Sequence, residues 1–315
     1  MNTTSTARRR GLVATAVISA AALLAACSSG GGGAEASAGS GTGTINVWSH
    51  QGTPDEVTAI QAAVSGFNSS QSDIKANLRL IPGDSYTTTI NQTPVDQLPD
   101  VLDMDGPTVA NYAYNLKLTP LEQFVSAQTV SNATDGSKAE GTYNGKLYAL
   151  AQFDSAMGFF GNKKMLDAAG VKYPTSLDNA WTGDEFAAAV KTLAGKSTSG
   201  KSLDITESAL SGEWGTYAFS PLIWSAGGNL IKDDKSEGVL NSPQSVEAMT
   251  SFATWKPYVD PNADGKAFQD GRVAIGMGGH WLYPDYSKAL GADLLVLPLP
   301  NMGQGAKAGA GSWTW

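Results

Sequence analysis

The sequence predicts an α/β protein with two lobes, each a sheet flanked by helices, and two observations lead to this prediction. Segments with strand character and segments with helix character alternate from Ile45 onward, which is typical of a largely parallel sheet with helices on its faces. The folded part then spans about 270 residues, which is more than a single hydrophobic core usually serves. We therefore expect one chain with two cores.

The first half of this body opens with a strand at Ile45–Ser49. A helix should follow, because Thr53 can act as its N-cap, Pro54 suits its first position, and apolar residues recur on one face from Val57 to Phe67. The next expected elements are a strand in IKANLRLI, a short helix in DSYTTTINQ with Asp84 as N-cap, a buried strand in PDVLDMD and a helix in PTVANYAYN.

The second half opens with a hairpin, because Asn144-Gly145 lies between two strand-like runs and suits a tight turn. A helix from Thr182 to Gly195 is expected, with Glu185 completing a capping box with Thr182. The further expected elements are helices in NKKMLDAAGV, in EWGTYAFSPLIWSAGG and in PQSVEAMTSFATW with Ser242 as N-cap, and strands within GRVAIGMGG and ADLLVLPLP.

The N-terminus has the order of an export signal, with Arg8–Arg10 before an apolar run of 16 residues that is shorter than the roughly 20 needed to cross a bilayer. The stretch Leu24–Cys27 resembles the lipobox of bacterial lipoproteins, in which the cysteine thiol is lipidated and becomes the new N-terminus. An ordinary secretory signal is the alternative, but Cys27 is the only cysteine in the chain, which favours lipidation. We expect residues 1–26 to be a signal peptide and residues 27–44 a lipidated Gly/Ser-rich tether on the extracytoplasmic face of the bacterial membrane.

The charge of the expected mature chain excludes one class of partner. Removing three arginines from the 21 Lys and Arg leaves 18 against 29 Asp and Glu, a net charge of −11. Nucleic acid would require a basic face, so we expect no nucleic-acid partner.

Three motifs suggest other chemistry, and their surroundings argue against each. GKSTSGKS at 195–202 matches a nucleotide-binding loop, but it follows a helix instead of a strand, and no helix begins at Lys201. DPNADG at 260–265 matches half of a calcium loop, but position 12 falls on Gly271 instead of a glutamate. There is no G-x-S-x-G motif, and the two histidines show no metal spacing, so we expect no catalysis, cofactor or metal.

An ordered series of segments resembles the extracellular solute-binding proteins of carbohydrate ABC importers. The segments are PDV, YNGKLYALAQFDSA, NKKMLDAAGV, PLIWSAGGNLI, AFQDGRVAIGMGGHW and LLVLPLPNMGQGAKAGAGSW. Two departures from the family pattern are visible. Trp181 only approximates the tryptophan of a Pro-Pro-x-Thr-Trp motif, and members of this family continue past Trp315, so the remainder of the first lobe is expected to be absent here.

The resemblance implies a type II periplasmic-binding-protein-like fold and a monomer that captures a sugar and delivers it to permease subunits with a separate cytoplasmic ATPase. It implies that the first lobe covers 45–153, the second lobe 154–308 and the return crossing 309–315. The hinge should then lie near Phe153–Ser155 and Gly311–Trp313.

A sugar site needs flat aromatic platforms and groups that pair with hydroxyls. The candidate platforms are Trp281, which matches a stacking aromatic of the family, and Trp224, Trp313, Trp48 and Tyr217. The candidate polar groups are Asp154, Asp103, Asp105, His280, His50 and Gln51, with Gly278 and Gly279 letting the backbone approach the ligand.

Alternative roles remain open for several of these residues. Trp48 and Tyr217 could be core residues, Asp103 and Asp105 could cap the helix that follows them, and Trp255 on a helix face is expected to pack. Two rival functions also remain. Paired carboxylates could hydrolyse a glycoside, or the ligand could be a peptide, a polyamine or another solute.

Overall fold

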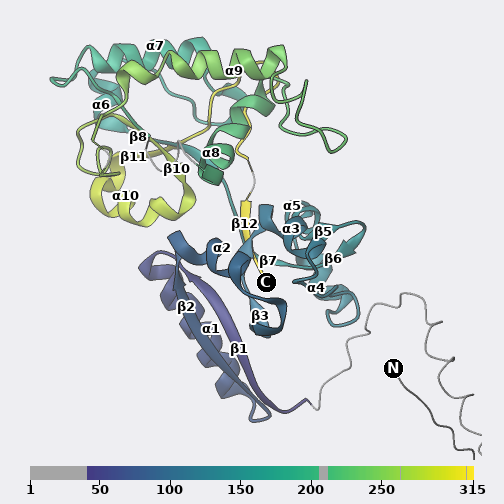
Figure 1. Cartoon of the computed structure of the whole chain (residues 1–315). Coiled ribbons are helices and arrows are strands. Elements are labelled where there is room, and N and C mark those ends of the chain that lie inside the picture. Colours follow the sequence, from purple (N-terminus) through teal and green to yellow (C-terminus); the bar gives the residue numbers. More distant parts are fainter. Residues whose placement is uncertain (1–40, 206–211, 263, 310) are drawn as a thin grey trace, which may run out of the picture. The chain divides into compact units, whose positions relative to one another are not determined.

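The computed structural model describes residues 41–205, 212–262, 264–309 and 311–315, which are drawn in colour in Figure 1. The expected signal peptide, Cys27 and most of the tether lie outside these residues. Within the described part of the chain, no helix is both long enough and apolar enough to cross a bilayer.

Strands and helices alternate through the first half and are mixed in the second. The strands are β1 Gly43–Gln51, β2 Ile74–Pro82, β3 Val101–Leu102, β4 Met104–Asp105, β5 Thr142–Tyr143, β6 Lys146–Leu147, β7 Ala151–Ser155, β8 Met157–Asn162, β9 Leu203–Ile205, β10 Ile275–Gly279, β11 Leu294–Leu297 and β12 Gly311–Thr314. The α-helices are α1 Pro54–Ser70, α2 Gly83–Gln92, α3 Val109–Tyr114, α4 Ala127–Asn132, α5 Asp135–Glu140, α6 Lys163–Ala168, α7 Gly183–Ala194, α8 Gly212–Ser225, α9 Pro243–Ala253 and α10 Tyr283–Leu290. Short 3₁₀ helices include η2 Gly106–Thr108 and η6 His280–Leu282.

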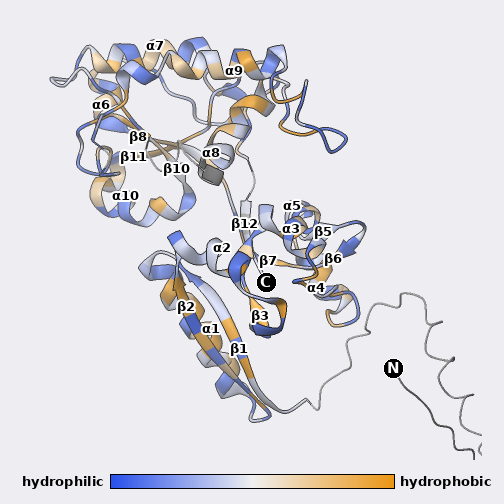
Figure 2. Cartoon of the chain, viewed as in Figure 1, coloured by the Kyte–Doolittle hydropathy of each residue, from blue (hydrophilic) through white to orange (hydrophobic). Residues whose placement is uncertain are grey.

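The first sheet has the order β2-β1-β3 and is parallel throughout, as predicted. Helix α1 begins where expected, because the hydroxyl of Thr53 accepts from the Glu56 amide and the Glu56 carboxylate accepts from the Thr53 amide. Figure 2 shows hydrophobic and hydrophilic residues on different faces of α1. The predicted Asp84 cap is wrong in detail. The N-cap of α2 is Pro82, and Asp84 lies in the first helical turn, where its negative charge interacts favourably with the helix dipole.

The second sheet has the order β11-β8-β10-β9 and is mixed, which differs from the largely parallel sheet that was predicted. Strands β10 and β9 are parallel, whereas β8 runs antiparallel to both of its neighbours. Strand β8 follows β7 after a single residue, Ala156, so the chain enters the second sheet directly from β7 without an intervening helix. Helix α7 has the predicted capping box of Thr182 and Glu185.

Both faces of the second sheet are covered, because neighbouring side chains of β8 point in opposite directions. Phe159 belongs to the larger core with α7, α8 and α9, where its ring stacks on Phe186 with centroids 4.4 Å apart. Phe160 faces the other way, into a smaller core with Phe268 and Tyr286. Trp255 is 0% exposed in the larger core, which confirms its predicted packing role.

The predicted hairpin is present between β5 and β6, with Asn144 at φ 48° and Gly145 at φ 75°. Positive φ at both central residues matches the tight turn that Asn-Gly favours. This hairpin leads into β7, which belongs to a third sheet of order β4-β12-β7. We call this third sheet the crossing sheet, because the chain passes through it on its way to the second sheet and again on its return.

Candidate functional site

The crossing sheet brings together residues that lie far apart in the sequence. Strand β12 lies between β4 and β7 and is antiparallel to both, so that Trp313 is opposite Asp105 on one side and Phe153 on the other, while Gly311 is opposite Ser155. Directly opposed residues share a face of the sheet. Asp105, Phe153, Ser155 and Trp313 therefore lie on one face of the crossing sheet, and both predicted hinge segments are neighbouring strands.

Two residues from the second sheet and its helices contact this same face. His280, at the end of β10, packs edge to face against Phe153, with ring centroids 5.9 Å apart. Tyr217, on α8, forms a 3.0 Å hydrogen bond between its hydroxyl and that of Ser155. The structure thus brings together Asp105, Trp313, Tyr217 and His280 of the predicted set.

Tyr217 contacts both β7 and β12, the two strands of the crossing sheet that carry the predicted hinge segments. Ser155 donates its only hydroxyl proton to the Gly311 carbonyl oxygen at 2.5 Å, so the Tyr217 hydroxyl is the donor to Ser155. A Cβ on Gly311 would overlap the Tyr217 ring, so the ring rests directly on the backbone of β12. Burial raises the pKa of the Tyr217 phenol, the Ser155 contact opposes this, and the charges of Asp105 and Glu140 raise the pKa further.

Trp281 is half-buried in η6 and packs partly against β10, the strand that precedes it. Its indole covers Gly279, where an added Cβ would overlap the ring, and Leu282 covers Gly278 in the same way. The two glycines were predicted to let the backbone approach a ligand, but the space above them is filled by these side chains. The ring centroid of Tyr217 lies 6.3 Å from that of Trp281, with the planes tilted by 32°, so the two rings are neighbours.

Asp103 has a structural role that the sequence did not predict. It is 1% exposed, and it accepts from the Ser49 hydroxyl at 2.6 Å and from the His50 amide at 3.0 Å. The His50 Nδ1 lies 3.0 Å from the same carboxylate, and the imidazole stacks on the Trp313 indole with centroids 3.3 Å apart. Asp103 therefore fixes the position of the His50 imidazole on which the Trp313 indole stacks. It does not cap η2, whose N-cap is Asp105 without a side-chain cap.

Asp154 lies away from the other predicted residues. It is opposite Ser312 in the ladder, so it occupies the face of the crossing sheet opposite to Trp313. There it is exposed and accepts a 2.6 Å hydrogen bond from Thr134, the N-cap of α5.

Three further candidates lie at the margins. The Trp48 ring packs against the hydrophobic core that includes Ile81 and Leu102. The Arg79 guanidinium lies 4.8 Å from the centroid of this ring, which fits the alternative packing role. Gln51 is exposed at the end of β1, and Trp224 is half-buried at the end of α8, 3.4 Å from the Asn229 amide oxygen.

Glu140 was missed by the sequence reading. It is the last residue of the short helix α5, and its carboxylate occupies the space where a Cβ on Gly106 would lie. Gly106 is buried and directly follows Asp105, so the Glu140 carboxylate lies beside the residue next to the ladder partner of Trp313. No local pattern in the sequence could have indicated this contact, since it depends on how α5 packs on η2.

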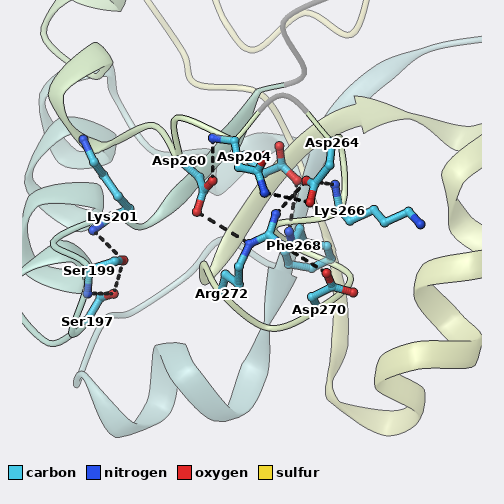
Figure 3. Close-up of polar contacts among 11 residues, drawn as sticks. Ser197, Ser199, Lys201, Asp204, Asp260, Asp264, Lys266, Phe268, Asp270 and Arg272 are labelled. Atoms are coloured by element: carbon cyan, nitrogen blue, oxygen red, sulfur yellow. Dashed lines mark hydrogen bonds and ion pairs between the residues drawn. The ribbon is translucent and has the colours of Figure 1, made fainter.

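The two motifs in the 195–272 region have structural roles, as Figure 3 shows. Lys201 does not begin a helix, and its ammonium donates to the Pro257 carbonyl at 2.7 Å, which fits the interpretation of this segment as a surface loop. In the calcium-like loop, Arg272 lies 2.6 Å from Asp264, 3.0 Å from Asp270 and 3.7 Å from Asp260. A guanidinium thus supplies the positive charge that these carboxylates require. Among the described residues, no three His, Cys, Asp or Glu side chains are grouped to hold a metal.

The surface also carries a groove of about 550 Å³ between α1 and β2. Its lining residues are Gln61, Val64, Ser65, Asn68, Ser69, Lys75, Leu78 and Leu80. None of the predicted site residues is among them.

Comparison with known proteins identifies the family of the chain. Residues 44–314 match a family described as bacterial extracellular solute-binding protein. A lipoprotein encoded in the oleD 5′ region of Streptomyces antibioticus is 27% identical over 201 residues, which are 62% of this chain and 43% of that protein. The chain thus spans less than half of that relative.

Solved structures show the same two-lobed fold, as predicted. A cyclic α-maltosyl-1,6-maltose binding protein from Arthrobacter globiformis has a TM-score of 0.71 at 25% identity, and the match covers 87% of this chain and 70% of that one. The GacH receptor of Streptomyces glaucescens has a TM-score of 0.72 at 22% identity, with the same coverage. By their printed names, the first is a binding protein and the second a receptor. The match along nearly the whole folded body shows that the chain belongs to the bacterial extracellular solute-binding protein family.

Proposed function

We propose that this chain is the substrate-binding component of an ABC importer, and that it captures a sugar or oligosaccharide outside the cell membrane and delivers it to the permease. Its lobes are assigned to residues 45–153 and 154–308, with the return crossing at 309–315. Binding and closure are its only tasks in this proposal, and ATP is hydrolysed by a separate cytoplasmic subunit.

One observation carries the proposal: aromatic residues of the second lobe and of the return crossing lie near a carboxylate of the first lobe at one face of the crossing sheet. Trp313 and Asp105 belong to this sheet, while Tyr217 and Trp281 approach from the second lobe. Indole and phenol rings suit the C–H faces of a sugar, and carboxylates accept hydrogen bonds from its hydroxyls. The Arthrobacter globiformis relative, by its printed name, binds an oligosaccharide, which supports the same class of ligand here.

The hinge assignment follows from the same sheet. Strands β7 and β12 carry the two crossings, and they pair in register through Gly311 and Ser155. Closure of one lobe over a ligand would bend this two-stranded ribbon, as in other hinge-closing binding proteins.

The anchor is assigned to Cys27. The resemblance of Leu24–Cys27 to a lipobox supports it, and so does the lipoprotein relative. Lipidation would hold a monomeric binding protein at the extracytoplasmic face, near the permease, because two or more acyl chains give durable anchoring.

A thermal-shift panel tests the ligand class. Neutral oligosaccharides, peptides and polyamines are each added to the mature protein. A rise of several degrees with a sugar supports the proposal, since a ligand at 100 times its Kd contributes about 2.7 kcal/mol. A rise with peptides or polyamines alone would refute the sugar assignment. Cleaved sugar in the same samples would instead indicate a glycosidase.

The Trp281→Ala variant tests the site. We expect it to abolish sugar binding while the free protein keeps its circular dichroism spectrum, because it removes one ring of the neighbouring Tyr217–Trp281 pair. Trp255→Phe is the matched control, since that indole lies 0% exposed in the core and should affect stability alone. Unchanged sugar affinity in Trp281→Ala would contradict the assignment of the site.

A further inference from the structure

We propose that Glu140, together with Asp105, determines which sugars this site accepts: neutral sugars and amino sugars bind, and sugars bearing a carboxylate or phosphate are rejected. This inference rests on the proposed sugar-binding function. It adds a specificity-determining residue, Glu140, that lies outside the set predicted from the sequence.

The position of Glu140 is built by its surroundings. Thr134 begins α5 by accepting from the Ser137 amide, and α5 ends at Glu140 after 6 residues. The Ser137 hydroxyl accepts from the Ala151 amide at 3.0 Å, which ties α5 to β7. At the other end of the helix, Gly106 leaves the space that the Glu140 carboxylate fills. Any larger residue at position 106 would displace that carboxylate.

The charge of Glu140 reaches the proposed binding surface. Asp105 immediately precedes Gly106 and lies opposite Trp313 in the ladder, so the carboxylate that contacts Gly106 lies one residue away from the carboxylate that pairs with the platform strand. Burial raises the pKa of the Tyr217 phenol, and the negative charges of Asp105 and Glu140 each raise it further. The negative field therefore extends from the first lobe to the aromatic residue that the second lobe contributes.

A negative field acts differently on three kinds of sugar. Hydroxyls of a neutral sugar can donate to the carboxylates, and a protonated amine adds a charge-assisted hydrogen bond. A uronate or sugar phosphate brings a like charge into a half-buried site, where the repulsion is screened less than at an open surface. One such repulsion is expected to weaken binding by roughly tenfold or more at low salt.

The experiment compares trisaccharides of the same backbone whose substituents carry different charges. Cellotriose, its 2-amino counterpart (the deacetylated chitosan trimer) and its 6-carboxylate counterpart are titrated into the mature protein by calorimetry, with the galactose and mannose series as further sets. We expect the neutral and amino forms to bind and the carboxylate to bind at least tenfold more weakly. The difference should shrink in high salt.

Two variants and a control assign the effect. Glu140→Gln keeps the shape and loses the charge, and it should reduce the neutral-to-carboxylate ratio several-fold, as should Asp105→Asn. Glu247→Gln removes one charge from the exposed surface of α9 and should leave the ratio unchanged.

Each outcome decides between the two proposals. If no sugar binds wild type, the proposed function fails, and this inference fails with it. If sugars bind but the carboxylate form binds as tightly as the neutral form, or if Glu140→Gln leaves the ratio as in wild type, the inference is refuted and the sugar-binding function stands. If a variant does not fold, the wild-type ratio and its salt dependence still give the answer.

Discussion

Replacing Asp103 tests whether this buried carboxylate supports the site from behind. The side chain is 1% exposed and accepts from the Ser49 hydroxyl, the His50 amide and the His50 imidazole. Asp103→Ala removes all three contacts and leaves buried donors without an acceptor. Each stranded donor costs about 1–3 kcal/mol, so the loss of three acceptor contacts should lower the free energy of unfolding by at least about 3 kcal/mol.

Thermal melts measure this loss. For a chain of this size, 1 kcal/mol corresponds to about 2–4 °C, so Asp103→Ala should lower the Tm by roughly 10 °C. Asp103→Asn keeps one acceptor oxygen and should lose about half as much. Glu247→Ala, on the exposed surface of α9, is the control and should change the Tm by less than about 2 °C.

A second measurement reports on the stack itself. The chain has only two histidines, so its imidazole NMR signals are those of His50 and His280. The His50 ring stacks on Trp313 at 3.3 Å, and its protons should therefore be shifted upfield by the indole ring current. Asp103→Ala should move that signal toward its ordinary position. A Tm within 3 °C of wild type, or a wild-type His50 signal without an upfield shift, would refute the reasoning.

Four further predictions follow from single contacts. Gly279→Ala should weaken sugar binding at least tenfold without backbone strain, since φ is −93° and only the Trp281 ring must move; calorimetry would show this. Burial raises the pKa of Asp204, opposed by its hydrogen bond from the Phe268 amide. The folded state therefore holds this proton more tightly than the unfolded state, stability is lost as pH rises through the raised pKa, and Asp204→Asn should flatten that loss in melts at pH 4 to 7. Arg272→Met should lower the Tm by several degrees, because it leaves three carboxylates without their shared cation, and unchanged melts would count against that role. Cys27→Ser should release the protein from the membrane fraction of expressing cells, and retention there would contradict the lipid anchor.

Local patterns were enough to predict most helices. Thr53 with Glu56 and Thr182 with Glu185 form the capping boxes that mark the starts of α1 and α7. The Asn144-Gly145 turn could be predicted in the same way, because the positive φ angles that it requires are favoured by these two residues themselves. In each case a short segment contains both partners of the interaction that determines its structure.

Interactions between distant segments could not be predicted in this way. The ladder that places Trp313 between Asp105 and Phe153 joins positions that are far apart in the chain. Glu140 depends on the packing of α5 against η2, and no spacing in the sequence encodes that contact. The mixed second sheet was also missed, because alternation of elements alone does not reveal strand direction, and β8 runs antiparallel to both of its neighbours.

One miss could have been avoided from the sequence itself. Phe153, Asp154 and Ser155 are consecutive in a strand, so Asp154 must point away from the face that its two neighbours share. Reading the segment as a strand, and not as a connection, would have removed Asp154 from the Trp313 face and added Phe153 and Ser155.

The acidic residues of this chain show that a carboxylate acquires its role from its position. Asp103 is buried against His50, which stacks on Trp313, while Asp105, two residues later, is half-buried and lies opposite Trp313 in the ladder. Asp264 pairs with Arg272 and contributes to folding. In the proposed binding site, the carboxylates near the aromatic face of the crossing sheet are the ones expected to select a ligand by charge. The choice between neutral and acidic sugars is therefore expected to depend on Asp105 and Glu140, and not on the net charge of the protein.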